Sequence, residues 1–137
     1  MMGAIEMDRA RLEALTQDFT ETFNHDDLDA MMAYFAPEAA VYDQHDGARA
    51  EGLAAIRAAF KPQFDRDFGT MGFAVEDLFI DAVQNKTMVS WLCTFDSKRG
   101  RTGWRGLDIL HFNDAGQITT KLTYAKAKAL QLDLVET

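Results

Sequence analysis

The second half of the chain restricts the fold most, because it reads as four consecutive β-strands joined by short polar turns. Alternating or continuous apolar residues mark these strands at residues 73–83, 87–95, 102–112 and 117–125. Residues 96–101 are polar and are expected to form a hairpin turn. Asn113-Asp114-Ala115-Gly116 is a tight turn of the kind that hairpins prefer. Consecutive strands with such short connections pair as an antiparallel meander.

The first half is predicted to be mainly helical. Apolar residues at three- and four-residue steps predict an amphipathic helix over about residues 8–24. Asp26 or Asp27 can cap a second, short helix, which Pro37 ends. The elements expected next are a strand over residues 40–45, a loop around Gly47 and Gly52, and a third helix over about residues 52–64.

Together these elements predict a single α+β domain over residues 1–137. The order is α-α-β-α-β-β-β-β, with three N-terminal helices packed on one face of a curved, mostly antiparallel sheet. Leu107, Ile109 and His111 would then face away from the helices. Because an exposed apolar sheet face usually meets a partner, we expect a homodimer formed through this outer face.

The charge balance argues against two classes of partner. The chain has 137 residues and a formal net charge of -8, whereas nucleic acids and anionic membranes are bound by basic patches. The N-terminus lacks the basic and apolar segments of a signal peptide, and no apolar stretch approaches membrane-spanning length. We therefore expect a cytoplasmic protein that binds neither nucleic acid nor membrane. The one cysteine, Cys93, lies in an apolar run and is expected to be buried and unreactive.

Two aspartates occupy apolar runs of the predicted strands. Side chains alternate along a strand, so Asp108 shares its face with Trp104, Leu110 and Phe112. A carboxylate on such a face is costly unless it is paired, hydrogen-bonded or protonated, and this suggests a pocket with acid/base chemistry. Asp43 lies on a predicted strand that is too short for its alternation to show which face of the sheet the side chain occupies. The alternative is that both aspartates are solvated strand residues.

Three segments of the chain carry a resemblance to a known family. They are the helix–break–helix opening at residues 23–29, the run at residues 34–43 with the later Gly52 and Ile56, and residues 106–118. Over about residues 8–125 the chain resembles the ketosteroid-isomerase-like and SnoaL-like branch of the nuclear transport factor 2 (NTF2-like) superfamily. The resemblance implies a cone-shaped sheet with a deep apolar pocket that the helices close. The activity stays open, because this fold carries isomerases, cyclases, dehydratases, hydrolases and binding modules.

The resemblance assigns roles to both aspartates. Asp43 matches the general base of ketosteroid isomerases. Asp108 matches their oxyanion-hole aspartic acid, and also the general acid/base of SnoaL-type polyketide cyclases. Phe19, Phe35 and Phe60 stand where ketosteroid isomerases commonly place tyrosines around the oxyanion hole. Since one oxyanion donor is worth roughly 3–4 kcal/mol in catalysis, this departure disfavours steroid isomerisation.

The expected pocket wall is mostly aromatic. Its residues are Phe19, Tyr34, Phe35, His45, Phe60, Trp91, Trp104, Leu110 and Lys121. The family match turns the face of Lys121 toward the pocket, where the amine can pair with Asp108 or with an anionic substrate. The alternative is a surface lysine whose stem covers apolar residues. Tyr34 and Tyr42 can supply hydroxyls that the phenylalanines lack.

Two kinds of function fit these residues. One is an isomerase- or cyclase-type enzyme that needs no cofactor or metal and acts on an apolar, carbonyl-bearing small molecule. Asp43 would be its base, and a protonated Asp108 would donate to the enolate oxygen. The other is a non-catalytic module for small-molecule binding or dimerisation. Hydrolase or dehydratase chemistry would need a histidine–aspartate pair, for which His45 beside Asp43 is the candidate.

Overall fold

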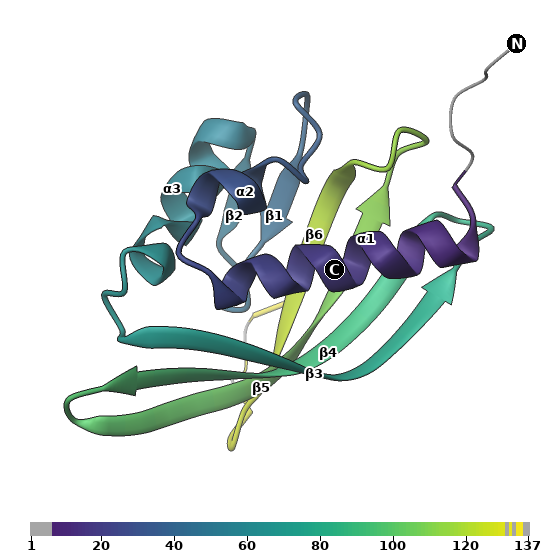
Figure 1. Ribbon diagram of the computed structural model, residues 1–137. Helices are drawn as coiled ribbons and strands as arrows, with labels where there is room; N and C mark the ends of the chain where they lie inside the picture. Colours follow the sequence, from purple (N-terminus) through teal and green to yellow (C-terminus); the bar gives the residue numbers. More distant parts are fainter. Residues whose placement is uncertain (1–6, 131, 133, 136–137) are drawn as a thin grey trace, which may run out of the picture.

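The computed structural model describes residues 7–130, 132, 134 and 135, so the N-terminal segment considered for a signal peptide lies mostly outside it. Its helices lie on one side of a strongly curved six-stranded sheet (Figure 1). The helical elements are α1 (Arg9–Glu21), the 3-10 turn η1 (Thr22–Asn24), α2 (Leu28–Met32) and α3 (Leu53–Phe64). The predicted α+β class with three helices is confirmed.

The helices begin at residues whose side chains cap them. Asp8 accepts a hydrogen bond of 2.8 Å from the backbone N–H of Arg11 at the start of α1. Asp27 caps α2 by accepting one of 3.0 Å from the backbone N–H of Ala30. Between the two capped helices, η1 forms the last residues of the predicted first helix and is followed by the predicted break. The second helix is shorter than expected, since α2 ends before Pro37 is reached.

The strands form one mixed sheet. They are β1 (Val41–Asp43), β2 (Arg49–Glu51), β3 (Thr70–Asp81), β4 (Lys86–Ser97), β5 (Gly100–Phe112) and β6 (Ile118–Lys126). Their order across the sheet is β2-β1-β6-β5-β4-β3. β1 runs parallel to β6, and every other neighbouring pair is antiparallel. The predicted meander is therefore β3 to β6, and the parallel contact attaches the early strands to its far edge.

Two local predictions were wrong. The segment around Gly47 is not only a loop, because it contains β2, which pairs with β1. The sequence of β2, Arg-Ala-Glu, has a single apolar residue and so shows no alternation that a pattern search can detect. The polar turn expected over residues 96–101 is also tighter, because β4 continues to Ser97 and β5 begins at Gly100.

The helices pack on the inner face of the sheet. Leu12 and Phe19 of α1 and Ile56 of α3 are 0% exposed, and Phe60 is 1% exposed. β5 alternates as predicted: Asp108, Leu110 and Phe112 are buried on this face, whereas the residues between them are only half-buried. The parity that placed Asp108 on the buried face is therefore confirmed.

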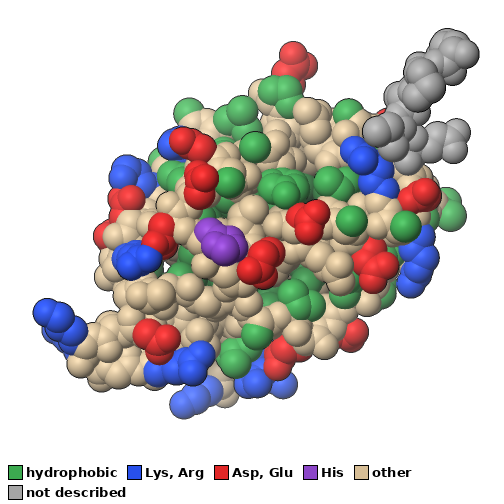
Figure 2. All heavy atoms as spheres, in the orientation of Figure 1, with side chains coloured by type: hydrophobic (Ala, Val, Ile, Leu, Met, Phe, Trp, Pro, Cys, Tyr) green, Lys and Arg blue, Asp and Glu red, His purple; other side chains and the backbone are tan. Residues whose placement is uncertain are grey.

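The opposite, outer face of the sheet is partly apolar. Leu107, Ile109 and His111 are half-buried there, and Tyr124 is 54% exposed. On the face seen in Figure 2, the acidic and basic side chains of the described residues are interspersed with apolar ones. None of the helices in the described residues is long and apolar enough to span a membrane.

Candidate active site

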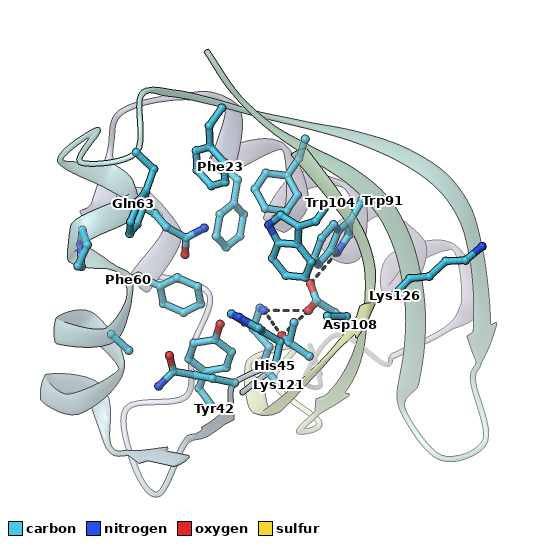
Figure 3. Close-up of a pocket in the computed structure, with 18 of the residues that line it drawn as sticks. Phe23, Tyr42, His45, Phe60, Gln63, Trp91, Trp104, Asp108, Lys121 and Lys126 are labelled. Carbon is cyan, nitrogen blue, oxygen red and sulfur yellow. Dashed lines mark hydrogen bonds and ion pairs between the residues drawn. The ribbon is translucent and has the colours of Figure 1, made fainter. Parts of the chain in front are cut away.

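Asp108 is a buried carboxylate that three side chains hold by hydrogen bonds (Figure 3). Its Oδ1 accepts from Lys121 Nζ at 2.8 Å and from Thr123 Oγ1 at 2.7 Å. Its Oδ2 accepts from Trp91 Nε1 at 3.1 Å. The residue is 3% exposed. All three partners donate, so both carboxyl oxygens of Asp108 act as hydrogen-bond acceptors in this arrangement.

Lys121 provides the positive charge that accompanies Asp108. β6 turns Lys121 and Thr123 to the same inner face, and Nζ donates to Thr123 Oγ1 at 2.7 Å. The Lys121 side chain is only 4% exposed. Its ammonium also lies 4.5 Å from the ring centroid of Tyr42 and 5.3 Å from that of Phe60, within the range of cation–π attraction. The interpretation of Lys121 as a surface lysine is therefore wrong.

These charged groups line a cavity of about 510 Å³. Aromatic side chains make up a large part of its wall: Phe23, Tyr42, His45, Phe60, Phe68, Phe73, Trp91, Phe95 and Trp104. Asp108 and Lys121 lie side by side at one part of it (Figure 3), and Thr123 is hydrogen-bonded to both. A mostly apolar pocket with a small convergent polar group is the usual form of a small-molecule site.

The structure divides the residues expected at the pocket into two groups. His45, Phe60, Trp91, Trp104 and Lys121 line it. Phe19, Tyr34, Phe35 and Leu110 are not among its lining residues, which corrects their expected placement.

The displaced residues belong to the packed region beneath α1. The Phe19 ring meets the rings of Tyr34 and Phe35 edge to face, each at 5.8 Å between centroids. Leu110 is 0% exposed in the same apolar cluster. Leu110 does share the buried face of Asp108, as predicted, but there it is packed into the apolar cluster instead of lining the cavity.

Asp43 is not brought to Asp108. In β1, Tyr42 is the partner of Lys121 and Asp43 is the partner of Leu122 in β6, so Asp43 lies on the outer face. Its side chain is 38% exposed, with Oδ1 at 3.5 Å from an Arg49 guanidinium nitrogen. Asp43 does not line the cavity. This corrects the expectation that both aspartates share one pocket. Of the histidine–aspartate pair considered for dehydratase chemistry, His45 lines the cavity and Asp43 does not.

Tyr42, the neighbour of Asp43, is the hydroxyl that reaches the pocket. It is 6% exposed, and its ring stacks on that of Phe60 with 4.4 Å between centroids and 7° between planes. Burial raises the pKa of the Tyr42 hydroxyl, and the nearby Lys121 ammonium opposes this to a smaller extent. At neutral pH the hydroxyl is therefore a hydrogen-bond donor.

Sequence reasoning missed several other pocket residues. They are Phe23, Gln44, Gln63, Phe68, Phe73, Phe95, Thr123 and Lys126. Thr123 had a detectable signal, because it shares the parity of Lys121 on β6. Phe68 and Gln63 lie near the end of α3 and the following loop, where neither helix nor strand periodicity predicts direction.

The remaining reactive residue types offer no second chemical centre among the described residues. Cys93 is 0% exposed, as expected, and burial raises the pKa of its thiol to about 12, so it is not a thiolate at neutral pH. No group of three or more His, Cys, Asp or Glu side chains that could hold a metal ion is found within the described ranges.

Comparisons with known proteins agree with this architecture. The model of the SnoaL-like domain matches residues 16–120. No curated protein sequence matches the chain. Among solved structures, SalBIII, an epoxide hydrolase/cyclase-like enzyme in pyran ring formation in the polyether salinomycin, is 17% identical, with a TM-score of 0.75. That match covers 85% of this chain and 92% of the other.

Two further structures are similar in the same way. A putative polyketide cyclase from Xanthomonas campestris pv. campestris is 24% identical, with a TM-score of 0.67, over 85% of this chain and 90% of that one. A Mycobacterium tuberculosis protein in complex with estradiol-17beta-hemisuccinate is 18% identical, with a TM-score of 0.69, over 83% and 92%. Such identities establish a shared fold. Because the domain model spans most of its length, the chain belongs to the SnoaL-like family of the NTF2-like superfamily.

Proposed function

We propose that the protein is a cofactor-independent acid/base enzyme of the isomerase or cyclase type, acting on an apolar, carbonyl-bearing small molecule. One observation carries this proposal: a buried carboxylate and a buried ammonium, 2.8 Å apart, line an aromatic cavity. Two opposite charges held out of water are expensive unless they are well paired. A site that keeps them at a cavity wall supplies a base and a cation to the same ligand.

Asp108 is the proposed base. Its Oδ1 accepts two hydrogen bonds but its Oδ2 accepts only one, from Trp91, so Oδ2 can still accept a proton from a bound ligand. This replaces the role expected from the family resemblance, in which Asp43 was the base and a neutral Asp108 donated. One carboxylate is sufficient when it removes a proton from one carbon and returns it to another, as in an isomerisation.

Lys121 is the proposed partner of the oxygen on which charge develops. Two of its N–H groups donate to Asp108 and Thr123, and the third is free for a ligand oxygen. A hydrogen bond to a charged group contributes about 1.5–3 kcal/mol, comparable with a single oxyanion-hole donor. The Tyr42 hydroxyl is a second donor at the same cavity.

The structural relatives support the ligand class. One is described as an epoxide hydrolase/cyclase-like enzyme, another as a putative polyketide cyclase, and a third holds an estradiol derivative. A pyran ring and an estradiol derivative are ring systems, and an aromatic wall with one polar cluster would bind compounds of this kind. We also propose that the outer sheet face, with Leu107 and Ile109, forms a homodimer interface.

A non-catalytic binding module is the second candidate. The observation in its favour is that Asp108 has a donor on both oxygens, so the cluster can also serve as a purely structural polar centre. The two candidates differ in whether Asp108 ever exchanges a proton with a ligand.

Hydrogen exchange separates them. In deuterated buffer, the protein should accelerate the incorporation of deuterium at the α-carbon of a flat apolar ketone such as 2-tetralone. Mass spectrometry of the ketone measures the rate of incorporation. Asp108→Asn should abolish the acceleration, whereas Asp43→Asn, which changes a carboxylate on the other face, should leave it intact. If 2-tetralone raises the melting temperature but its exchange stays at the uncatalysed rate, the protein is a binding module.

A further inference from the structure

The lysine in the pocket differs from the other lysines of the chain. The Lys121 side chain is 4% exposed and lines the cavity. The others are exposed or half-buried: Lys61, Lys86, Lys98, Lys126 and Lys128. Even Lys126, which also borders the cavity, directs its amine away from it (Figure 3). A primary amine at the wall of an apolar pocket becomes a nucleophile toward carbonyl carbon once it loses a proton.

We propose that Lys121 forms a reversible covalent iminium with an aldehyde or ketone bound in the cavity. The inference rests on the proposed function, because both require a carbonyl-bearing ligand beside Asp108. It adds a covalent role for a residue that the acid/base proposal uses only as a charge. Two observations carry it: the amine contacts a group that can take its proton, and aromatic walls surround both.

The proton acceptor already touches the amine. Lys121 Nζ lies 2.8 Å from Asp108 Oδ1, so a proton can pass along an existing hydrogen bond. Exposed ion pairs keep their charges because water solvates them, but an apolar ligand filling this cavity removes the remaining solvent. The neutral amine and carboxylic acid then become accessible with no change in the net charge of the site. Thr123, which accepts from Nζ at 2.7 Å, holds the nitrogen in place meanwhile.

The step balances within the site. The lone pair of the neutral Lys121 amine forms a bond to the carbonyl carbon, the C=O π bond breaks, and a proton moves from nitrogen to oxygen to give a carbinolamine. The Asp108 carboxylic acid then protonates the hydroxyl, the C–O bond breaks and water leaves. The nitrogen lone pair forms C=N, which leaves a protonated iminium and an Asp108 carboxylate. The carbonyl oxygen departs as water, and nothing is oxidised or reduced.

An iminium would supply what the phenylalanines lack. A protonated C=N withdraws electrons from the neighbouring carbon, so its α-proton becomes acidic without an oxyanion hole to hold a developing negative oxygen. The regenerated Asp108 carboxylate is then beside that carbon as the base. The ring centroid of Phe60 lies 5.3 Å from Lys121 Nζ. In this mechanism Phe60 needs no hydroxyl and serves only as part of the apolar cavity wall.

Reductive trapping on the natural chain tests the proposal. The protein is mixed with cinnamaldehyde at low ratio and sodium cyanoborohydride, and peptide mass spectrometry measures labelling at each lysine. The other five lysines are internal controls, more accessible but without a carboxylate partner in a cavity. Lys121 should be labelled about tenfold faster than any of them, because the pocket holds the aldehyde against the amine. Labelling confined to the exposed lysines would overturn the proposal.

Two variants separate this proposal from the acid/base one. Lys121→Arg keeps a positive charge beside Asp108 but cannot form an iminium, and Lys128→Arg is the matched surface control. If Lys121 acts covalently, Lys121→Arg loses both trapping and α-deuterium exchange into 2-tetralone. If the natural protein exchanges deuterium, is not trapped and keeps its exchange rate in Lys121→Arg, the iminium is refuted while the acid/base function stands. Absence of exchange with trapping at Lys121 refutes the proton-transfer function instead.

Discussion

Replacing Lys121 with methionine should destabilise the fold strongly, because it leaves Asp108 as a buried charge without its cationic partner. Breaking a buried ion pair by removing one partner costs about 3–5 kcal/mol. Trp91 and Thr123 still donate to Asp108 in the variant, which places the expected loss near the lower end of that range. The cation–π contact with the Tyr42 ring is lost as well and adds about 1 kcal/mol. The predicted fall in the free energy of unfolding is therefore about 4 kcal/mol.

A double variant distinguishes the lost charge pair from lost packing. Methionine is similar in length to the lysine stem, so Lys121→Met with Asp108→Asn removes both charges and keeps most of the volume. The amide can still accept from Trp91. The double variant should be more stable than Lys121→Met alone by about 1–3 kcal/mol, because it no longer leaves a buried charge without its partner. Lys126→Met, on the same strand but exposed, should change stability by less than about 0.5 kcal/mol.

Urea unfolding followed by tryptophan fluorescence measures these differences. Both tryptophans, Trp91 and Trp104, border the cavity, so the signal reports directly on its collapse. A loss below about 1 kcal/mol in Lys121→Met would mean that Asp108 is not a desolvated charge. A double variant no more stable than the single one would mean that the effect comes from packing instead.

Other perturbations follow from the same contacts. Tyr42→Phe should weaken the binding of a ketone ligand by about 0.5–1.5 kcal/mol while preserving the stack on Phe60, and isothermal titration measures the change. Phe60→Ala removes a ring that is 1% exposed and should cost about 3–5 kcal/mol in urea unfolding. Burial lowers the pKa of His111 below its usual 6.5, and the positive charge of Lys86 lowers it further. The unfolded chain therefore binds more protons than the folded one near this pH. Stability should therefore fall as the pH drops through 6.5, and this slope should be smaller in His111→Gln.

The face of Asp108 was predictable from sequence because it follows from one long strand. β5 has 13 residues, and its alternation of apolar side chains fixes which positions point inward. Asp43 had no such support, since β1 has only 3 residues and its face depends on how it pairs with β6. The family resemblance supplied a role for Asp43, but the pairing places Tyr42 on the pocket side and Asp43 outside.

The contact between Lys121 and Asp108 was one of the alternatives that the family resemblance left open, and the sequence could not choose it for a different reason. Parity places both on the inner face, but which residues become neighbours depends on the register of β5 against β6. That register changes between His111 and Phe112, where a bulge or irregularity interrupts the pairing. It makes Thr123 the direct partner of Asp108 and Leu110 the partner of Lys121. The lysine therefore reaches diagonally to the carboxylate, a geometry that no pattern within one strand contains.

Gly106 shows how a single small residue completes the site. It lies on the inner face of β5 and is the cross-strand partner of Trp91. A Cβ at this position would approach to 2.8 Å from Cη2 of Trp91 and 3.0 Å from Cζ3 of Trp104. Glycine therefore gives the two indoles room to meet edge to face, 4.8 Å between centroids.

The space left by the missing Cβ of Gly106 also determines the direction of the indole N–H of Trp91. With the ring lying over Gly106, Nε1 reaches Asp108 Oδ2 at 3.1 Å and satisfies the oxygen that neither Lys121 nor Thr123 contacts. A glycine inside a strand pattern commonly marks a close approach of another group, although the sequence does not name that group. Here it joins the aromatic wall to the buried carboxylate. The contact between the two indoles and the hydrogen bond from Trp91 to Asp108 thus depend on the same missing side chain.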